Sequence, residues 1–478
     1  MFNSKSIQYL HRFSSKDLQA FQLFVASPYF NKHQNTIALF HYLQKLKKWN
    51  EETLGKAIVF KAIFPDKKYD PQLLSNLNSY LLKLIRQFLI QRKLESNSTE
   101  RQLTLMESCF DNGQQNLFEL TAGRLQKTLA SDPIQDSIYH LQQNRFYELL
   151  DDFDLSYGNR SSGEHLEKAL ANFDIYVISK KLKMTCQVLA RNQVTAQQYA
   201  LSLIPEILQF IEKKRNHFQT IPSVWVYYLI YKMISQNAAD YFNQLKEILP
   251  SQIQHFHHQE GHDLYTHLVN YCIRQINSGK AAFKREAFEL YKQMLEYGLL
   301  YNNGILAQWN YTNITSLGCL LKEYDWVKKF IHQQKEKLSK EQKDNTFHFN
   351  LASFYYSQKD FDQALLHVRE VIFTEVHYDL LTRILRVKIY FDQRDWSALE
   401  YELEKFRIFL LRNKKITDRR RKSALNLLRF AKLLMRLFQS KPISPKLEYK
   451  KERTTLKKSI LENENVLNKD WLLQQLEA

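Results

Sequence analysis

A pair formed by an aspartate and an aromatic residue recurs in this chain at a fixed interval of 35 residues, as Asp325-Trp326, Asp360-Phe361 and Asp395-Trp396. A period of this length is typical of stacked helical hairpins. Around the middle copy, small residues at Ala352 and Ala364 allow two antiparallel helices to approach closely. Tyr355 and Phe361 are placed to fill the space beside them. The spacing therefore predicts an α-solenoid of antiparallel helical hairpins.

The composition favours the same all-α fold class. Ten glycines and nine prolines in 478 residues are too few for an all-β protein or for a chain rich in phosphate-binding loops. Strings typical of phosphate-binding loops and nucleophile motifs, such as GxxxxGK[ST] and GxSxG, do not occur in the sequence. We therefore expect a non-enzymatic protein with no cofactor.

Start and stop signals divide the chain into four parts. Ser14 with Asp17 predicts a capped helix that ends before Pro28, and Asp70-Pro71 predicts the start of a long helix. The expected organisation is an N-terminal helical unit at 1–97, irregular helical hairpins at 98–254, TPR-like helical repeats at 262–440, and a basic C-terminal tail with a short terminal helix at 441–478.

The cysteines and the apolar segments predict the cellular setting. Cys109, Cys186, Cys272 and Cys319 are far apart in the sequence, which favours buried, reduced thiols over a metal site. The N-terminus lacks the apolar run of a signal peptide, and the densest apolar stretch, 224–231, is shorter than a membrane span. A cytoplasmic protein with no membrane span is expected.

The segment from Asn350 to Ala364 resembles a tetratricopeptide repeat (TPR), because Leu351, Ala352, Tyr355 and Ala364 fall on signature positions of that repeat. The flanking copies depart from the pattern, with Lys329, Val387 and Leu399 where small residues belong. The whole chain also resembles an uncharacterised family of helical proteins found in Bacteroidota. Three segments carry this likeness: Ser27-Pro28-Tyr29-Phe30-Asn31, the string from Asn270 to Asn277, and Phe406-Arg407 followed by Arg412-Asn413-Lys414.

The likeness to tetratricopeptide repeats implies a surface that binds a protein or peptide partner. Asn350 matches the position that grips a peptide backbone in carboxylate-clamp domains of that family. The expected partner-binding residues are those of inward-facing repeat helices, with two arginines nearby: Asn350, Ser353, Arg383, Arg386 and Tyr390.

Positive charge is concentrated near the C-terminus. Residues 411–460 carry a net charge of +14 out of +18 for the whole chain. Lys422, Arg429, Lys432 and Arg436 fall within about an 80° arc of a helix at ~100° per residue. Together with Arg419, Arg420 and Arg421, they form the expected anion-binding set, within a basic stripe over residues 412–436. The apolar residues of the opposite arc, including Ala424, Leu427 and Leu434, are expected to be core.

The basic stripe is open to several interpretations. It can be a solvated face that caps the last repeat, or it can bind an acidic protein, nucleic acid or an anionic membrane. The leading hypothesis is an interaction scaffold with a protein partner, possibly acidic. The alternative is a nucleic-acid-associated protein that uses residues 412–436 as a phosphate track.

Five histidines lie between His255 and His267, with Glu260 and Asp263 among them. These side chains could hold zinc or nickel, or form a pH-sensitive contact. Gly261 interrupts the spacing that would align His258 with His262 on a helix, and the segment is therefore expected to be an exposed linker.

Overall fold

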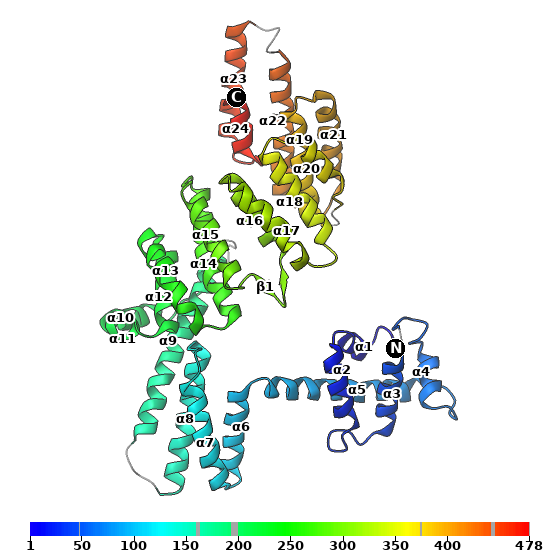
Figure 1. The fold of residues 1–478 in the computed structure, drawn as a ribbon, viewed down its shortest axis with the longest axis vertical. Coiled ribbons are helices and arrows are strands. Elements are labelled where there is room, and N and C mark those ends of the chain that lie inside the picture. The colour runs from blue at the N-terminus through cyan, green and yellow to red at the C-terminus, as the bar shows by residue number, and fades with distance from the viewer. Residues whose placement is uncertain (47, 159–162, 193–198, 373–374, 441–444, 478) are drawn as a thin grey trace. The chain divides into compact units, whose positions relative to one another are not determined.

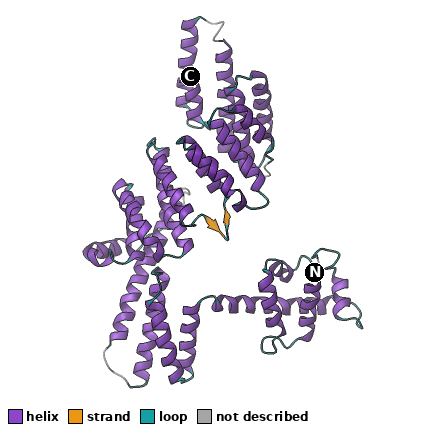
Figure 2. Cartoon of the chain, in the orientation of Figure 1, coloured by secondary structure: helices purple, strands orange, loops and turns teal. Residues whose placement is uncertain are grey.

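The computed structural model describes residues 1–46, 48–158, 163–192, 199–372, 375–440 and 445–477. Internal contacts divide the chain into two compact units. The first contains residues 1–187 and 199–228, and the second contains residues 188–198 and 229–478. Helices make up nearly all of the regular structure in the described ranges (Figures 1 and 2), which confirms the all-α prediction at the level of fold class.

The first unit begins with a small bundle built on one long helix. This bundle contains α1 (Lys5–Leu10), α2 (Ser15–Ala26), α3 (Gln34–Lys45), α4 (Lys56–Ile63) and the long helix α5 (Pro71–Glu95). They are followed by α6 (Ser98–Asp111), α7 (Gln115–Ala130), α8 (Ser137–Ser156), α9 (Glu164–Asn192), α10 (Ile204–Lys213), α11 (Arg215–Phe218) and α12 (Pro222–Gln236). The last residues of α9 and of α12 belong to the second unit.

The predicted caps of the first bundle are confirmed. The Ser14 side chain accepts a hydrogen bond from the Asp17 backbone N–H, and α2 ends at Ala26. The Asp70 side chain accepts from the backbone N–H groups of Gln72 and Leu73, with Pro71 at the first position of α5. These bonds satisfy N–H groups that have no partner within a helix. One face of α5, which includes Leu77 and Leu81, is buried in the core of this bundle.

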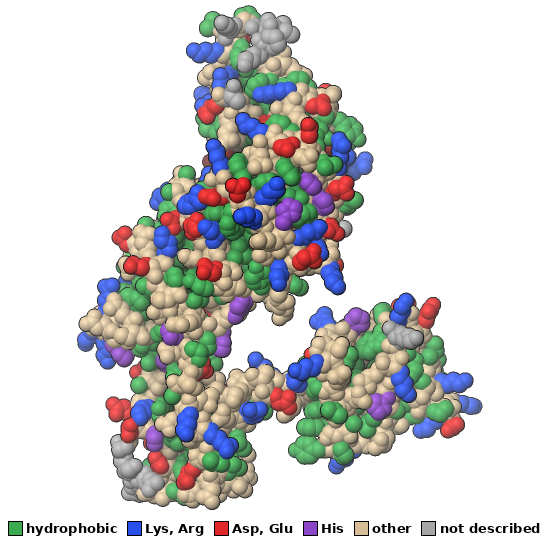
Figure 3. Space-filling model, viewed as in Figure 1, with side chains coloured by type: hydrophobic (Ala, Val, Ile, Leu, Met, Phe, Trp, Pro, Cys, Tyr) green, Lys and Arg blue, Asp and Glu red, His purple; other side chains and the backbone are tan. Residues whose placement is uncertain are grey.

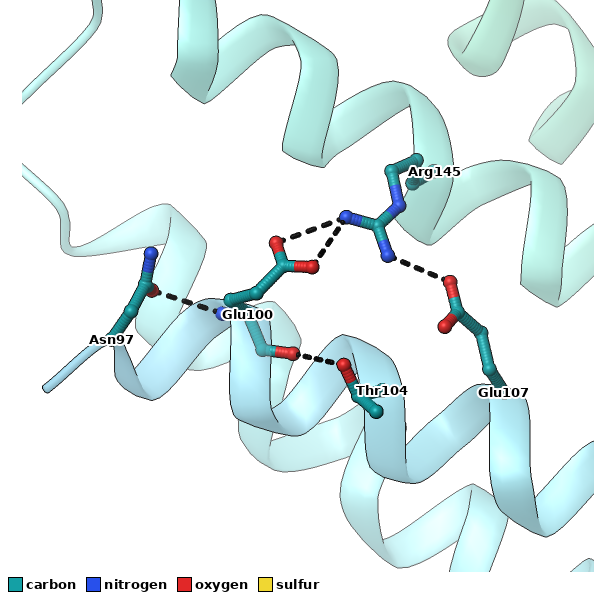
Figure 4. A network of polar contacts seen from close by, with 5 residues as sticks. All are labelled: Asn97, Glu100, Thr104, Glu107 and Arg145. Atoms are coloured by element: carbon teal, nitrogen blue, oxygen red, sulfur yellow. Dashed lines mark hydrogen bonds and ion pairs between the residues drawn. The ribbon is translucent and has the colours of Figure 1, made fainter. Parts of the chain in front are cut away.

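A polar network fastens α8 to α6 within the first unit (Figure 4). The Arg145 guanidinium donates to both carboxylate oxygens of Glu100 at 2.9 Å, and to Glu107 at 2.7 Å. Asn97 caps α6 by accepting from the Glu100 backbone N–H at 3.0 Å. A single arginine therefore joins two carboxylates placed two turns apart on the neighbouring helix.

The second unit continues with helices that pack as successive pairs. They are α13 (Ala239–Gln252), α14 (His258–Asn277), α15 (Phe283–Glu296), α16 (Gln308–Leu320), α17 (Tyr324–Gln334), α18 (Lys343–Ser357), α19 (Phe361–Arg369), α20 (Val376–Asp392), α21 (Trp396–Arg412), α22 (Asp418–Ser440), α23 (Lys446–Glu462) and α24 (Lys469–Glu477). Two 3-10 turns follow α13 and α17, at Ile253–His255 and Lys335–Lys337. Each helix from α14 to α22 packs on the next, and α18 also packs on α16 and α20.

The same three-residue turn closes three of these pairs. Its middle residue is left-handed, with φ of 61° at Lys322, 64° at Lys359 and 60° at Arg394. The following residue donates its backbone N–H to the carbonyl five residues earlier: Glu323 to Gly318, Asp360 to Tyr355, and Asp395 to Tyr390. This bond pattern is a helix C-terminal motif that usually places glycine at the left-handed position.

The repeated turn corrects the predicted register at its first copy. Asp360 and Asp395 both cap the helix that follows, accepting from Gln363 and Ala398. The equivalent of Asp360 in the first copy is Glu323, 37 residues earlier, whereas Asp325 lies within the first turn of α17. An aspartate is also favourable in a first helical turn because of the helix dipole. The 35-residue spacing of Asp325 from Asp360 is therefore not the structural repeat.

Small residues set the helix separation as expected. Ala352 on α18 and Ala364 on α19 are both fully buried, and Tyr355 and Phe361 pack beside them. Gly318 has the same role on α16, because a Cβ atom there would collide with Val327 of α17 and with the Phe288 ring.

A two-stranded hairpin departs from the purely helical prediction. β1 (Tyr301–Asn302) pairs antiparallel with β2 (Ile305–Leu306), and Tyr301 lies opposite Leu306. The turn residues Asn303 and Gly304 have positive φ of 50° and 78°, as an Asn-Gly hairpin turn requires.

The C-terminal segment contains more helix than expected. Residues 441–444, at the start of the expected basic tail, lie outside the described residues. The predicted terminal helix around Trp471 is present as α24, and the charged segment before it forms the 17-residue α23. Within the described part of the chain, every helix falls short of the length and apolarity that a bilayer-crossing segment needs. The four cysteines are buried and unbonded to one another, as predicted.

Candidate functional site

A basic pocket of about 600 Å³ lies between α20, α21 and the loop that follows α21. Five of its nine lining side chains are cationic, and none is acidic. The lining consists of Val376, Arg383, Lys405, Ile408, Phe409, Arg412, Asn413, Lys414 and Lys415. Of the five residues expected to bind a partner, Arg383 lies in this pocket.

The Arg383 guanidinium is held in place on two sides. Its Nε donates to Asp379 at 3.0 Å, one turn earlier on α20, and its plane lies 4.2 Å from the centre of the Phe409 ring. Among the described residues, its Nη1 is enclosed and has no hydrogen-bond partner. The pocket therefore contains a fixed cation with one unused donor.

A buried carboxylate lies close to this arginine. Glu402 on α21 is only 4 % exposed. Burial raises the pKa of Glu402, and the nearby Arg386, Lys405 and Arg383 act in the opposite direction. Arg386 also donates to the Val368 carbonyl at 3.2 Å, at the end of α19. Arg386 on α20 thus bonds to α19 and lies near Glu402 of α21. The Glu402 carboxylate partly offsets the positive charge of Arg386.

The remaining predicted partner-binding residues have packing roles. Asn350 is fully buried, and its amide donates to the Thr346 carbonyl at 2.7 Å and to the Thr312 hydroxyl of α16 at 3.2 Å. It therefore has no exposed surface to offer a peptide. Ser353 donates to the Phe349 carbonyl of its own helix at 3.0 Å. Tyr390 is half-buried against the core formed by α20 to α24.

Arg421 fastens the loop that forms one wall of the basic pocket. Its guanidinium donates to the carbonyls of Leu410 at 3.0 Å, and of Asn413 and Ile416 at 3.1 Å each. It also forms an ion pair with Asp418. The Asn413 side chain accepts from the Lys415 backbone N–H at 3.0 Å. The Arg421 guanidinium therefore bonds to the loop and is not available to bind an anion. The same bonds hold the backbone that carries Lys414 and Lys415.

The Lys and Arg side chains of the predicted basic stripe do not share one surface, because they contact different parts of the structure. Lys432 pairs with Glu400 of α21 at 3.4 Å, and Arg420 contacts His377. Arg429 and Arg436 line a groove of about 730 Å³ between α22 and α23, which also contains Glu448 and Glu452. Arg419 and Lys422 are exposed. Over the face shown in Figure 3, Lys and Arg side chains are interspersed with Asp and Glu.

The opposite, apolar face of α22 is core, as predicted. Ala424, Leu427 and Leu434 are completely buried. Phe430 and Leu437, which are close to the basic arc, are also buried. The apolar surface of α22 is thus wider than the sequence indicated, because α23 and α24 both pack on this helix.

The C-terminal helix α24 is seated against α20 and α22. Trp471 lies 5.3 Å from the Phe391 ring, between centroids, and Leu472 and Leu476 are buried beside it. Gln475 donates to Asp392 at 2.8 Å, and the other Asp392 oxygen accepts from Tyr356 of α18 at 2.7 Å. An amphipathic helix therefore covers this face through an apolar side and a polar anchor.

A partly buried lysine lies beneath α24. Lys388 donates to the Asn468 side chain at 2.6 Å, and its ammonium group is 5.8 Å from the centre of the Trp471 ring. Burial lowers the pKa of Lys388 to about 8, although Asp392 opposes the shift. Burial also raises the pKa of Asp392.

The histidine-rich segment corrects another prediction. It is not a linker, because α14 begins at His258 and the helix is continuous through Gly261. A Cβ atom at Gly261 would lie 2.8 Å from the Ile253 side chain and 3.0 Å from the Leu299 side chain, and the glycine therefore allows close packing there. Within the described ranges, His, Cys, Asp and Glu side chains nowhere gather in a group of three or more that could hold a metal ion.

Sequence reasoning missed Lys405 and Phe409 as pocket residues and noticed Arg412, Lys414 and Lys415 only as part of a charged run. The available signal was the helical spacing of Lys405, Phe409 and Arg412, which places them on one side of α21. Comparison of the chain with protein-family models, with curated proteins and with solved structures finds no significant match.

Proposed function

We propose that this chain is a non-enzymatic interaction scaffold, in which TPR-like helical hairpins hold a helix or an extended segment of a protein partner. The observation that carries the proposal is the docking of α24. Three of its apolar side chains are buried, and Gln475 anchors it to Asp392. Helical arrays bind amphipathic helices of other chains in the same way, by burying the apolar face of the helix in a groove.

The proposal is supported by the way the hairpins pack. Three of the pairs are closed by the same turn, and α18 packs on both α16 and α20, so that these alternate helices lie side by side. Repeats of this kind create extended binding surfaces from many small contributions. Such a surface suits a long, irregular protein segment better than a compact ligand.

The alternative, a phosphate track along residues 412–436, receives less support. Arg421 bonds to its own loop, Lys432 pairs with Glu400, and two acidic residues share the groove of Arg429 and Arg436. Counterion release depends on cations that are free to neutralise phosphates. These cations are divided among different partners instead of following one line.

Chemical crosslinking in the native host, followed by recovery of the full-length chain, tests the scaffold proposal. We expect a reproducible set of protein partners whose crosslinks fall within residues 258–440 and survive nuclease treatment. Crosslinks that disappear with nuclease would favour the phosphate track. Recovery of the chain without any partner would contradict the scaffold.

A further inference from the structure

We infer that the basic pocket binds an acidic peptide segment that contains at least one apolar residue. This inference deepens the proposed function and rests on it, because it names the chemistry of the partner. It is drawn from the side chains that meet between α20, α21 and the loop after α21.

The charge of the pocket is the first argument. Five cations line it, and Arg386 lies close behind. One nearby carboxylate is already engaged, because Asp379 bonds to Arg383. The other, Glu402, is buried, and the charges of Arg386, Lys405 and Arg383 oppose the rise in its pKa. Cations therefore outnumber carboxylates around the pocket, and Lys405, Arg412, Lys414 and Lys415 are all exposed. A surface of this kind attracts an anion over several ångströms.

The second argument is that the pocket is built before any ligand arrives. Arg421 holds the loop through three backbone carbonyls, and Ile416 of the same loop is buried in the core. Stacking on Phe409 fixes Arg383. Because these groups are already ordered, binding loses less conformational entropy than it would on a flexible basic tail.

The third argument concerns the kind of anion. Val376, Ile408 and Phe409 contribute an apolar part to the lining, and Ile408 is 38 % exposed. One side of the Phe409 ring already stacks on Arg383, which leaves less of the ring for a nucleic-acid base. An apolar patch among lysines and arginines matches a peptide in which an apolar residue is flanked by Asp or Glu. The lysines at the rim of the pocket speed the association of an acidic peptide, and the central apolar contact contributes to its binding affinity.

The test uses the full-length chain and a fluorescein-labelled peptide of about ten residues, composed of Asp and Glu around two Leu, with binding followed by fluorescence anisotropy. A triple variant, Lys405→Glu, Lys414→Glu and Lys415→Glu, reverses three exposed charges of the pocket. The matched control, Lys328→Glu, Lys329→Glu and Lys340→Glu, makes the same change in net charge at exposed positions elsewhere in the second unit. Circular dichroism checks that both variants keep their helical content.

We expect the pocket variant to bind the peptide roughly 10-fold more weakly, because three cations that attract the acidic peptide become like charges that repel it. The control should change affinity less than about twofold, and affinity should fall as salt rises. Equal weakening by both variants would overturn the inference, as would an absence of peptide binding. Tighter binding of a single-stranded oligonucleotide that displaces the peptide would assign the pocket to nucleic acid instead.

The crosslinking experiment separates this inference from the scaffold proposal. If the pocket variant still recovers the same partners, the scaffold stands and the pocket is not the binding site. If the wild-type chain binds the acidic peptide but recovers no protein partner, the pocket stands and the scaffold proposal fails.

Discussion

At the scale of single residues, two glycines within helices should respond to the same substitution in opposite directions. In Gly318→Ala, the new Cβ collides with Val327 and Phe288, and we expect a loss of about 1–3 kcal/mol from overpacking. In Gly123→Ala, on the exposed face of α7, nothing lies within 4 Å of the new methyl group, and the better helix propensity of alanine should add about 1 kcal/mol. Thermal unfolding of the two variants measures both effects. If both substitutions destabilised the chain, the glycine at position 123 would be needed for a reason other than helix propensity.

A partly buried histidine on α14 predicts a pH dependence of stability. Burial lowers the pKa of His267 to about 4, with Asp263 raising it and Arg274 lowering it further. The unfolded state is protonated first as the pH falls from an ordinary value of about 6.5. The stability that this group contributes is therefore complete above pH ~6.5, declines down to pH ~4, and is constant below that. The full loss is about 3 kcal/mol.

His267→Gln removes the titrating group and tests this explanation. Urea unfolding at about pH 7.5 and pH 5 should show a smaller difference in stability for the variant than for the wild type. An unchanged difference would assign the pH dependence to other groups.

At the scale of elements, the repeated turn predicts different results for two equivalent positions. Lys359 has a φ of 64°, which costs a residue with a Cβ roughly 1–2 kcal/mol. Lys359→Gly relieves this strain, although glycine also gives more freedom to the unfolded chain, and we expect a net gain of about 0.5–1 kcal/mol. Arg394 occupies the same turn, but its guanidinium lies 4.0 Å from the centre of the Phe438 ring. Arg394→Gly loses that contact and should be neutral or destabilising. Differential scanning calorimetry measures the stability of both variants. An equal gain in stability would show that the contact between Arg394 and the Phe438 ring contributes nothing.

Sequence patterns predicted elements well where the signal was local. The caps at Ser14 and Asp70 and the small residues at 352 and 364 depend on neighbours within one helix or one hairpin. The register at Asp325 was wrong because aspartate is favourable both as a cap and in a first turn. The Asn303-Gly304 turn did carry a hairpin signal, which the helical pattern around it obscured.

The candidate site was less predictable because its residues come from separate elements. The periodicity of α22 indicated a basic stripe, but it could not show that Arg421 bonds to the loop before it or that Lys432 meets Glu400 of α21. Asn350 matched a family position, yet the polar side chain that it meets is Thr312, 38 residues earlier. Tertiary contacts decided the role of each of these side chains.

At the scale of the whole molecule, separate cores predict that distant substitutions act independently. The cores around α1–α5 and α6–α8 lie within the first unit, and those around α18–α20 and α20–α24 lie within the second. Arg145→Met in the first unit leaves Glu100 and Glu107 without their shared cation. Because those carboxylates are 37 % and 42 % exposed, we expect a loss of only about 1 kcal/mol. Gly318→Ala acts in the second unit.

The double variant tests whether each unit unfolds on its own. Because the two sites share no partners, each substitution should have the same effect on its own unit, within about 0.3–0.5 kcal/mol, whether or not the other is present. Hydrogen exchange locates each effect: Arg145→Met should speed exchange in α6 and α8, and Gly318→Ala should speed exchange in α16 and α17. Arg145→Lys is the control for Arg145→Met, since it keeps the charge while losing the two-pronged geometry. If either substitution accelerated exchange throughout all four helices, the chain would unfold as one cooperative body, and the division into two units would not describe its stability.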